Sequence, residues 1–167
     1  LNVFKQELQS LEIDLLPPDI NKSGRAFRVE KMASNKFGIR YALSAIKNVG
    51  GPAMVALELE RETSGDFLSL ENFTSRVDGK AVNKRSMENL VKAGAFDVLQ
   101  SDRAQIFNAV DLIIRHSNAA YEERNSDQDN LFGAVESSDH SSIKLPVVPV
   151  WSALEKLRNE FEAIGFY

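Results

Sequence analysis

A glycine-rich turn between two apolar stretches constrains the fold of this chain most strongly. It lies within residues 39–62, where Leu43 and Ile46 are spaced as on one face of a helix. Residues 48–51 (Asn-Val-Gly-Gly) then favour a break, because asparagine and glycine tolerate positive φ. Pro52 follows and suits the first turn of a new helix. The stretch therefore predicts helix, tight turn, helix.

Two interpretations of this turn are open from its residues alone. Val49 is the one apolar residue in the turn and can pack between the helices, as in a helix-hairpin-helix. That arrangement leaves backbone N–H groups unpaired at a helix N-terminus, where they can bind phosphate. An ordinary corner between two helices has the same local sequence.

Composition excludes several classes of site. The 167 residues are 43% hydrophobic and include no cysteine, which removes disulfides, thiolate nucleophiles and zinc–sulfur sites. No apolar run is long enough to span a membrane and no signal peptide opens the sequence, so we expect a cytoplasmic location without membrane contact. The first residue is Leu1, which predicts an excerpt of a longer polypeptide.

Charge is divided into blocks, although the net charge is −4. Residues 20–50 carry seven basic residues against one acid, Glu30. Residues 51–75 are mainly acidic, and residues 76–93 are basic again. Alternating blocks can place a basic face on an acidic protein, although any single block can equally be a solvated surface.

The first part of the chain predicts a small sheet. A helical start precedes three short strand candidates, at residues 13–16, 26–29 and 37–41. The simplest arrangement of these strands is antiparallel, feeding into the turn described above.

Helices follow, and several have good N-terminal caps. The second hairpin helix spans Pro52–Arg61, and Ser69, Asn83 and Ser101 are expected to cap the next three helices. Between the last two of these, Lys92–Ala95 forms a second glycine-containing turn. A repeated hairpin with basic residues beside each turn favours DNA contact.

From Ser117 the sequence becomes polar and acidic, which predicts a flexible segment to residue 150. Leu131 and Phe132 form an isolated apolar pair within it. They can pack back on the domain as a staple, or they can act as a linear recognition motif.

A last helix is predicted after Trp151, begun by a capping box of Ser152 and Glu155 and ended by Gly165. Its expected buried stripe is Leu154, Leu157, Phe161 and Ile164. The fold class is therefore mainly α: a tandem helix-hairpin-helix core preceded by a small β/α segment, with a flexible loop and a C-terminal helix.

A set of short motifs, in this order and spacing, resembles the alpha (polymerase) subunit of bacterial DNA polymerase III. The motifs are residues 16–21 (LPPDIN), 39–41 (IRY), 45–50 (AIKNVG), 82–85 (VNKR), 92–97 (KAGAFD) and 128–133 (QDNLFG). One departure is Asn48, where the family often has glycine; asparagine is the next most tolerant residue. The resemblance implies four segments: 1–38 from the end of the fingers region, 39–116 as the tandem helix-hairpin-helix unit, 117–150 with a clamp-binding motif, and 151–167 as a helix.

This resemblance implies that the chain grips duplex DNA independently of sequence and tethers the polymerase to the ring-shaped sliding clamp. The expected DNA-binding residues are Lys47, Asn48, Val49, Gly50, Gly51, Lys84, Arg85, Lys92, Ala93, Gly94 and Ala95. The expected clamp-binding peptide is Gln128-Asp129-Asn130-Leu131-Phe132, with Leu131 and Phe132 entering an apolar pocket and Gln128 at its rim.

The resemblance also implies that catalysis lies elsewhere in the longer polypeptide. The family holds two magnesium ions on palm aspartates, and other replicase subunits join through that longer chain. Asp14 and Asp19 lack metal-site spacing, and His116 and His140 are isolated. We therefore expect no catalytic or metal-binding residue and no cofactor in this chain. A repair-enzyme module, an error-prone polymerase paralogue and a purely structural helical domain are the alternatives.

Overall fold

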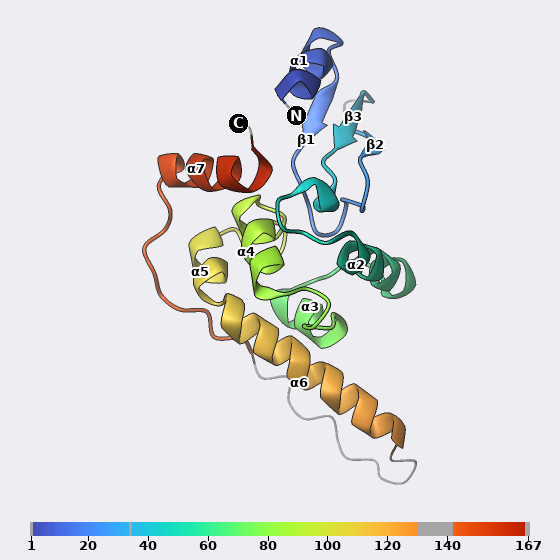
Figure 1. The fold of residues 1–167 in the computed structure, drawn as a ribbon, viewed down its shortest axis with the longest axis vertical. Coiled ribbons are helices and arrows are strands. Elements are labelled where there is room, and N and C mark those ends of the chain that lie inside the picture. Colours follow the sequence, from blue (N-terminus) through green and yellow to red (C-terminus); the bar gives the residue numbers. More distant parts are fainter. Residues whose placement is uncertain (1, 34, 130–141, 166–167) are drawn as a thin grey trace.

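The chain is mainly helical in the computed structural model, which describes residues 2–33, 35–129 and 142–165. In chain order the elements are α1 (Asn2–Ser10), β1 (Asp14–Leu16), β2 (Arg28–Lys31), β3 (Phe37–Arg40), the 3-10 helix η1 (Leu43–Ala45), α2 (Gly51–Ser64), α3 (Leu70–Arg76), α4 (Lys84–Lys92), α5 (Arg103–Asn108), α6 (Val110–Asp129) and α7 (Ala153–Ile164). Figure 1 shows α1 and the sheet at one end, α6 along the other, and the remaining helices between. Within the described ranges no helix has the length and apolar character needed to cross a membrane. The predicted fold class is confirmed.

The sheet is mixed, so the expectation of a wholly antiparallel sheet is wrong. Strand β3 lies in the middle, antiparallel to β2 and parallel to β1, with Leu15 opposite Ile39. The N–H of Met32 donates to the Lys36 carbonyl at 2.8 Å between β2 and β3, whereas residues 17–27 intervene between β1 and β2. A parallel pair needs a long crossover, and this connection together with β2 supplies it.

Arg40 ties the sheet to the chain beside it. Its guanidinium is buried and donates from Nε and Nη2 to the Glu30 carboxylate, at 2.7 and 2.8 Å, and from Nη1 to the Pro17 carbonyl at 2.7 Å. The hydrogen bonds from Arg40 are the main reason why the pKa of Glu30 lies below its usual value.

Stability of the sheet should therefore depend on pH through Glu30. A carboxyl group with a lowered folded pKa contributes stability that is fully present above its unfolded pKa, about 4.3, and is lost as the pH falls through the folded value. We expect Glu30→Gln to lower the melting temperature at pH 7 and to flatten its decline below about pH 5. Thermal unfolding followed by circular dichroism measures both, with Glu7→Gln on exposed α1 as the charge-matched control. Parallel pH profiles for Glu30→Gln and the wild type would contradict this assignment.

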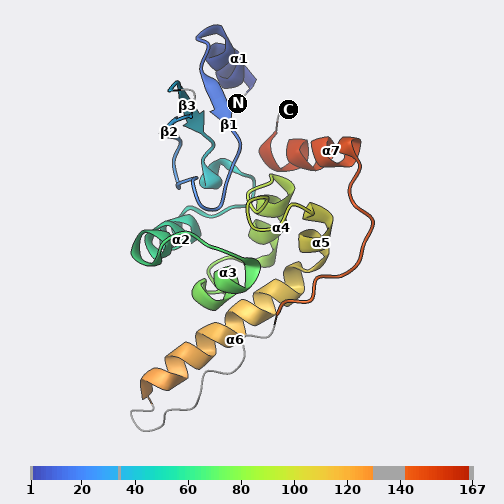
Figure 2. The same cartoon turned by 180° about the vertical axis from the view of Figure 1, so that it is seen from behind.

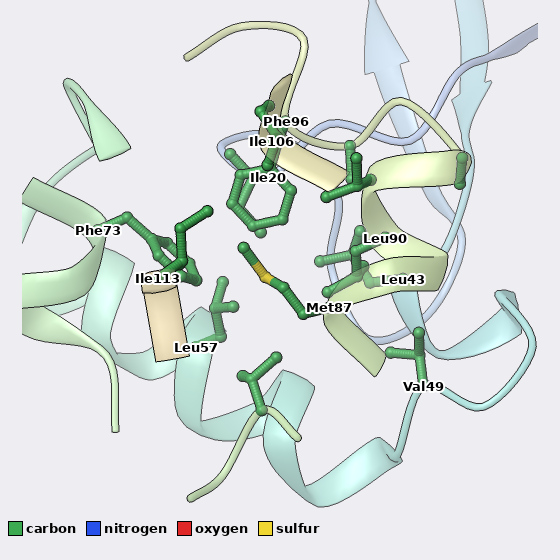
Figure 3. Close-up of a cluster of buried hydrophobic side chains, with 14 of the residues drawn as sticks. Ile20, Leu43, Val49, Leu57, Phe73, Met87, Leu90, Phe96, Ile106 and Ile113 are labelled. Atoms are coloured by element: carbon green, nitrogen blue, oxygen red, sulfur yellow. The ribbon is translucent and has the colours of Figure 1, made fainter. Parts of the chain in front are cut away.

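The core gathers around α4. Met87, Leu90 and Val91 on its buried face are each 1% exposed or less, and Figure 3 shows Met87 and Leu90 pointing toward side chains from α2, α3 and α6. The rings of Phe73 and Phe96 meet edge to face, with centroids 5.1 Å apart. Burying each large side chain contributes about 1.5–3 kcal/mol relative to leaving it exposed, so α4 is the element on which the helical part depends.

Capping residues lie largely where the sequence places them. Ser69 and Asn83 each accept a hydrogen bond from the backbone N–H three residues later, and Ser152 with Glu155 completes a capping box. Asp102, rather than Ser101, caps α5. Gly165 ends α7 in a left-handed conformation with φ of 94°. These local predictions are confirmed except for the one-residue shift at α5.

Two helical boundaries differ from the prediction. The stretch before the first turn forms only the 3-10 helix η1 instead of an α-helix. Helix α6 continues past Ser117 to Asp129, where a flexible segment was expected. Its second half contains alanine, glutamate and arginine, which favour helix, and the Arg124 guanidinium reaches the Arg76 carbonyl at 3.3 Å, so this half is also tied to α3.

The C-terminal helix presents a different face from the one predicted. Leu154, Leu157 and Phe161 are 77%, 45% and 43% exposed, whereas Ala163 is fully buried. The segment 142–152 runs back past α5, as Figure 2 shows, with Ile143 donating to Glu71 at 3.1 Å and Trp151 packing on Phe107. The expected stripe is wrong for these three residues, whereas Ile164 is partly buried and packs against the core as predicted. Polar contacts to α4 and α5, described below, set the rotation of α7.

Candidate nucleic-acid interface

The first turn faces outward and holds the backbone conformation predicted for it. Asn48 has φ of 61°, while Gly50 is extended and serves as the N-cap of α2. Val49 is buried and its N–H donates to the Ile46 carbonyl at 3.2 Å. A methyl group added at Gly50 or Gly51 would meet no atom within 4 Å. The turn is thus anchored by its apolar residue and open on its other side.

The start of α2 offers backbone donors at this open side. Gly50 has no side chain to cap the helix, and Pro52 occupies the first turn. The first N–H groups of a helix have no acceptor within it, and they carry the positive end of the helix dipole. An anionic oxygen at this position would satisfy them.

Helix α4 joins the turn through one hydrogen bond. The Ser86 hydroxyl donates to the Asn48 carbonyl at 2.7 Å, and the N–H of Ser86 donates to the Asn83 cap at 2.9 Å. Lys84 and Arg85, exposed in the same first turn of α4, are therefore brought beside residues 48–51. Two regions far apart in the sequence form one basic surface.

The basic side chains of this surface differ in their partners. Lys84 pairs with Asp111 of α6 at 2.7 Å, and this hydrogen bond raises the pKa of Lys84. Among the residues that the structure describes, Lys47 and Arg85 form no ion pair within 4 Å. Both are exposed, so their charges face solvent directly.

The second turn is built differently, and the expectation of outward-pointing amides at Ala93–Ala95 is wrong. All three residues are buried. Their N–H groups donate to the carbonyls of Asn89, Val91 and Leu90, each at 3.0 Å. The Ala95 carbonyl in turn accepts from the Ile20 N–H at 2.7 Å. This turn packs within the core, and its three N–H groups are already hydrogen-bonded, so they are not available to a phosphate.

Arg103 organises the second turn, a role that the sequence did not indicate. It makes two bonds to Asp97, at 2.7 and 2.6 Å, and one to Glu160 of α7 at 2.6 Å. Burial lowers the pKa of Arg103, but the hydrogen bonds to the two carboxylates outweigh it and raise the pKa. Gly94 lies against this guanidinium with φ of 83°.

Gly94→Ala should destabilise the chain for two reasons, and a matched glycine separates them. Gly165 is left-handed, with φ of 94° and ψ of 6°, but has open space around it, so Gly165→Ala should cost only the left-handed strain, about 1–2 kcal/mol. At Gly94 the methyl group would also displace the Arg103 guanidinium from Asp97, and we expect a loss of about 2–4 kcal/mol. Urea unfolding of both variants measures the difference. Equal losses would show that the Arg103 contact adds nothing.

Lys92 closes the second turn against α7. Its ammonium lies 2.9 Å from the Glu162 carboxylate and 5.5 Å from the centroid of the Phe107 ring. It is therefore part of an interface between helices, unlike Lys47 and Arg85.

The expected clamp-binding peptide lies mostly outside the described residues. The backbone of Gln128 belongs to the last turn of α6, whereas Asn130, Leu131 and Phe132 fall in the gap at 130–141. Their role remains a prediction.

No group of three or more histidine, aspartate or glutamate residues that could hold a metal ion occurs in residues 2–33, 35–129 and 142–165. The magnesium ions implied by the resemblance stay a prediction for other parts of the longer polypeptide.

The fold and the first turn are those of the helix-hairpin-helix class of proteins. The family model described as "Helix-hairpin-helix motif" matches residues 12–106, more than half of the chain, so the chain belongs to this family.

Full-length matches then point to a particular subunit. The chain is 37% identical over 167 residues to the DNA polymerase III subunit alpha of Caulobacter vibrioides, 37% over 169 residues to that of Borreliella burgdorferi, and 38% over 167 residues to that of Thermus aquaticus. These alignments cover 100%, 100% and 98% of this chain and 14%, 14% and 12% of the three relatives. The resemblance to this subunit family is confirmed, and the chain spans about one-seventh of the length of these relatives.

Proposed function

We propose that this chain binds the sugar–phosphate backbone of duplex DNA, independently of sequence, through residues 48–51 and the first turn of α4. The observation that carries the proposal is the 2.7 Å hydrogen bond from Ser86 to the Asn48 carbonyl. It holds Lys84 and Arg85 beside an outward-facing turn at a helix N-terminus. Helix-hairpin-helix family membership supports the same conclusion.

The chemistry of this surface suits a phosphate and offers no means of distinguishing bases. The first N–H groups of α2 can donate to phosphate oxygens with fixed direction, while Lys47 and Arg85 add positive charge. Contacts to phosphates position a protein on the duplex and carry no sequence information. The net charge of −4 confines attraction to this local surface.

Removing the two unpaired cations should weaken binding in a salt-dependent way. Each lost phosphate contact lowers the slope of log K against log salt by about 0.9. We expect Lys47→Met/Arg85→Met to reduce the slope by about 2 and the affinity by about tenfold or more at 0.1 M salt. Fluorescence anisotropy with a labelled duplex, titrated at several salt concentrations, measures both quantities.

The matched control is Lys31→Met/Lys36→Met, which removes the same charge from exposed positions near the sheet. It should change affinity much less. Equal losses from both pairs of substitutions would mean that only net charge matters, and the assigned surface would be rejected.

We also propose that Gln128–Phe132 binds the sliding clamp of the cognate replicase. The support is the peptide sequence itself and the full-length similarity to alpha subunits. Helix α6 carries the backbone to Asp129, so the peptide begins at the end of a long helix. Leu131 and Phe132 would supply the apolar anchors.

Leu131→Ala/Phe132→Ala should strongly weaken clamp binding. Loss of two apolar anchors is expected to weaken binding by about thirtyfold or more, measured by surface plasmon resonance on immobilised clamp. Val147→Ala/Val150→Ala, which truncates two other exposed apolar residues, should leave binding unchanged. Retained binding by the first variant would assign Leu131 and Phe132 to packing within the chain.

We infer that the longer polypeptide to which this segment corresponds is a DNA-directed DNA polymerase that acts with other replicase subunits. Its magnesium-dependent chemistry would lie outside these residues. The residues of this chain would contribute binding to duplex DNA and to the sliding clamp. The full-length similarity supports this assignment over a module of a repair enzyme.

A further inference from the structure

Glu162 of α7 lies among positive charges beside the proposed DNA surface. Its carboxylate is 2.9 Å from the Lys92 ammonium and 3.7 Å from the Arg158 guanidinium. The hydrogen bond from Lys92 is the main cause of the lowered pKa of Glu162, and the charges of Lys92, Arg158 and Lys47 act in the same direction. The group is therefore an anion held by several cations.

This cluster adjoins the first turn. The N–H of Lys47 donates to the Ala163 carbonyl at 2.9 Å, so the last turn of α7 touches the residue that precedes Asn48. The C-terminal end of a helix is its negative pole, and Glu162 adds a full negative charge to it. A duplex approaching residues 48–51 would meet this negative end at close range.

We propose that Glu162 acts as an internal phosphate mimic, and that DNA binding replaces its carboxylate with a backbone phosphate held by Lys92 and Arg158. The inference rests on the proposed DNA-binding function and extends its surface from the first turn onto α7. In the free chain Glu162 pairs with Lys92, so Lys92 is not available to DNA. This pairing limits the affinity for DNA.

The exchange requires little rearrangement. The side chain of Glu162 is 46% exposed and that of Arg158 is 81% exposed, so both can change rotamer without moving the helix. Helix α7 stays in place through buried Ala163 and through the bond from Glu160 to Arg103. Arg103 is itself excluded from the exchange, because it is 12% exposed and already shared between two carboxylates.

Glu162→Gln tests the proposal because it removes the charge while keeping nearly the same shape. We expect up to about eightfold tighter duplex binding at 0.1 M salt and a salt slope steeper by up to about 0.9, as for one added phosphate contact. Glu62→Gln, at the exposed far end of α2, is the control for the same change in net charge. Thermal unfolding checks that both variants keep the fold.

A double-mutant cycle then identifies the cation involved. Lys92→Met should weaken binding only slightly in the wild type, where Lys92 is already paired, and by several-fold in the Glu162→Gln background. Arg158→Met should follow the same rule. Equal effects of each substitution in both backgrounds would overturn the exchange mechanism.

The outcomes distinguish this inference from the function on which it rests. If the wild-type chain binds no duplex and Glu162→Gln binds none, the proposed function and the inference both fail. If the wild type binds with the expected salt dependence but Glu162→Gln matches Glu62→Gln, only the phosphate-mimic inference is overturned.

Discussion

Burial of one face of α4 is the constraint on which the other features depend. This nine-residue helix places Met87, Leu90 and Val91 in the core, and its two ends make polar contacts in opposite directions. Ser86 at its start bonds to the first turn, and the turn that follows it receives the Ile20 N–H on the Ala95 carbonyl. A helix this short is not stable alone. Its position therefore comes from packing, and a shift of α4 would move the proposed DNA surface and the second turn together.

The two glycine-containing turns are similar in sequence but have different roles in the structure. Both contain glycine with lysine nearby, so their local signals are alike. The first has a positive-φ residue at exposed Asn48 and an open glycine cap, whereas the second has positive φ at buried Gly94 under a guanidinium. Donors can serve a ligand only where the chain has not already satisfied them. By that criterion the first turn has donors available to a phosphate, whereas the second turn packs α4 against the core and α7.

Local features of the fold could be predicted from sequence because their causes lie within a few residues. The caps at Ser69, Asn83 and Ser152 and the left-handed Gly165 depend on neighbouring N–H groups and on φ alone. The parallel pairing of β1 with β3 and the rotation of α7 depend on partners tens of residues away. Apolar spacing suggested that Leu154, Leu157 and Phe161 face inward, but the spacing could not reveal that Arg103 and Lys92 draw the opposite face of α7 toward the core. The same limit applies to the site: Lys47, Lys84 and Arg85 could be predicted individually, whereas the roles of Ser86 and Arg103 depend on contacts with residues far away in the sequence.

In an acidic protein that binds a polyanion, the positions of the carboxylates affect the affinity. The ion pairs of this chain illustrate the effect. Asp111 and Glu162 each pair with a lysine of α4, at its first and last residues, whereas Lys47 and Arg85 form no ion pair within 4 Å among the residues that the structure describes. A surface pair of this kind contributes little to folding, because solvent screens it, so stability alone gives little reason for it. Its larger effect is on affinity, because an internal carboxylate and a phosphate compete for the same donors. Sequence-independent binding that is too tight would hold the protein at one place on the duplex. Carboxylates within reach of the lysines that we propose to bind phosphate would keep the contact strong enough to hold DNA and weak enough to be broken and remade.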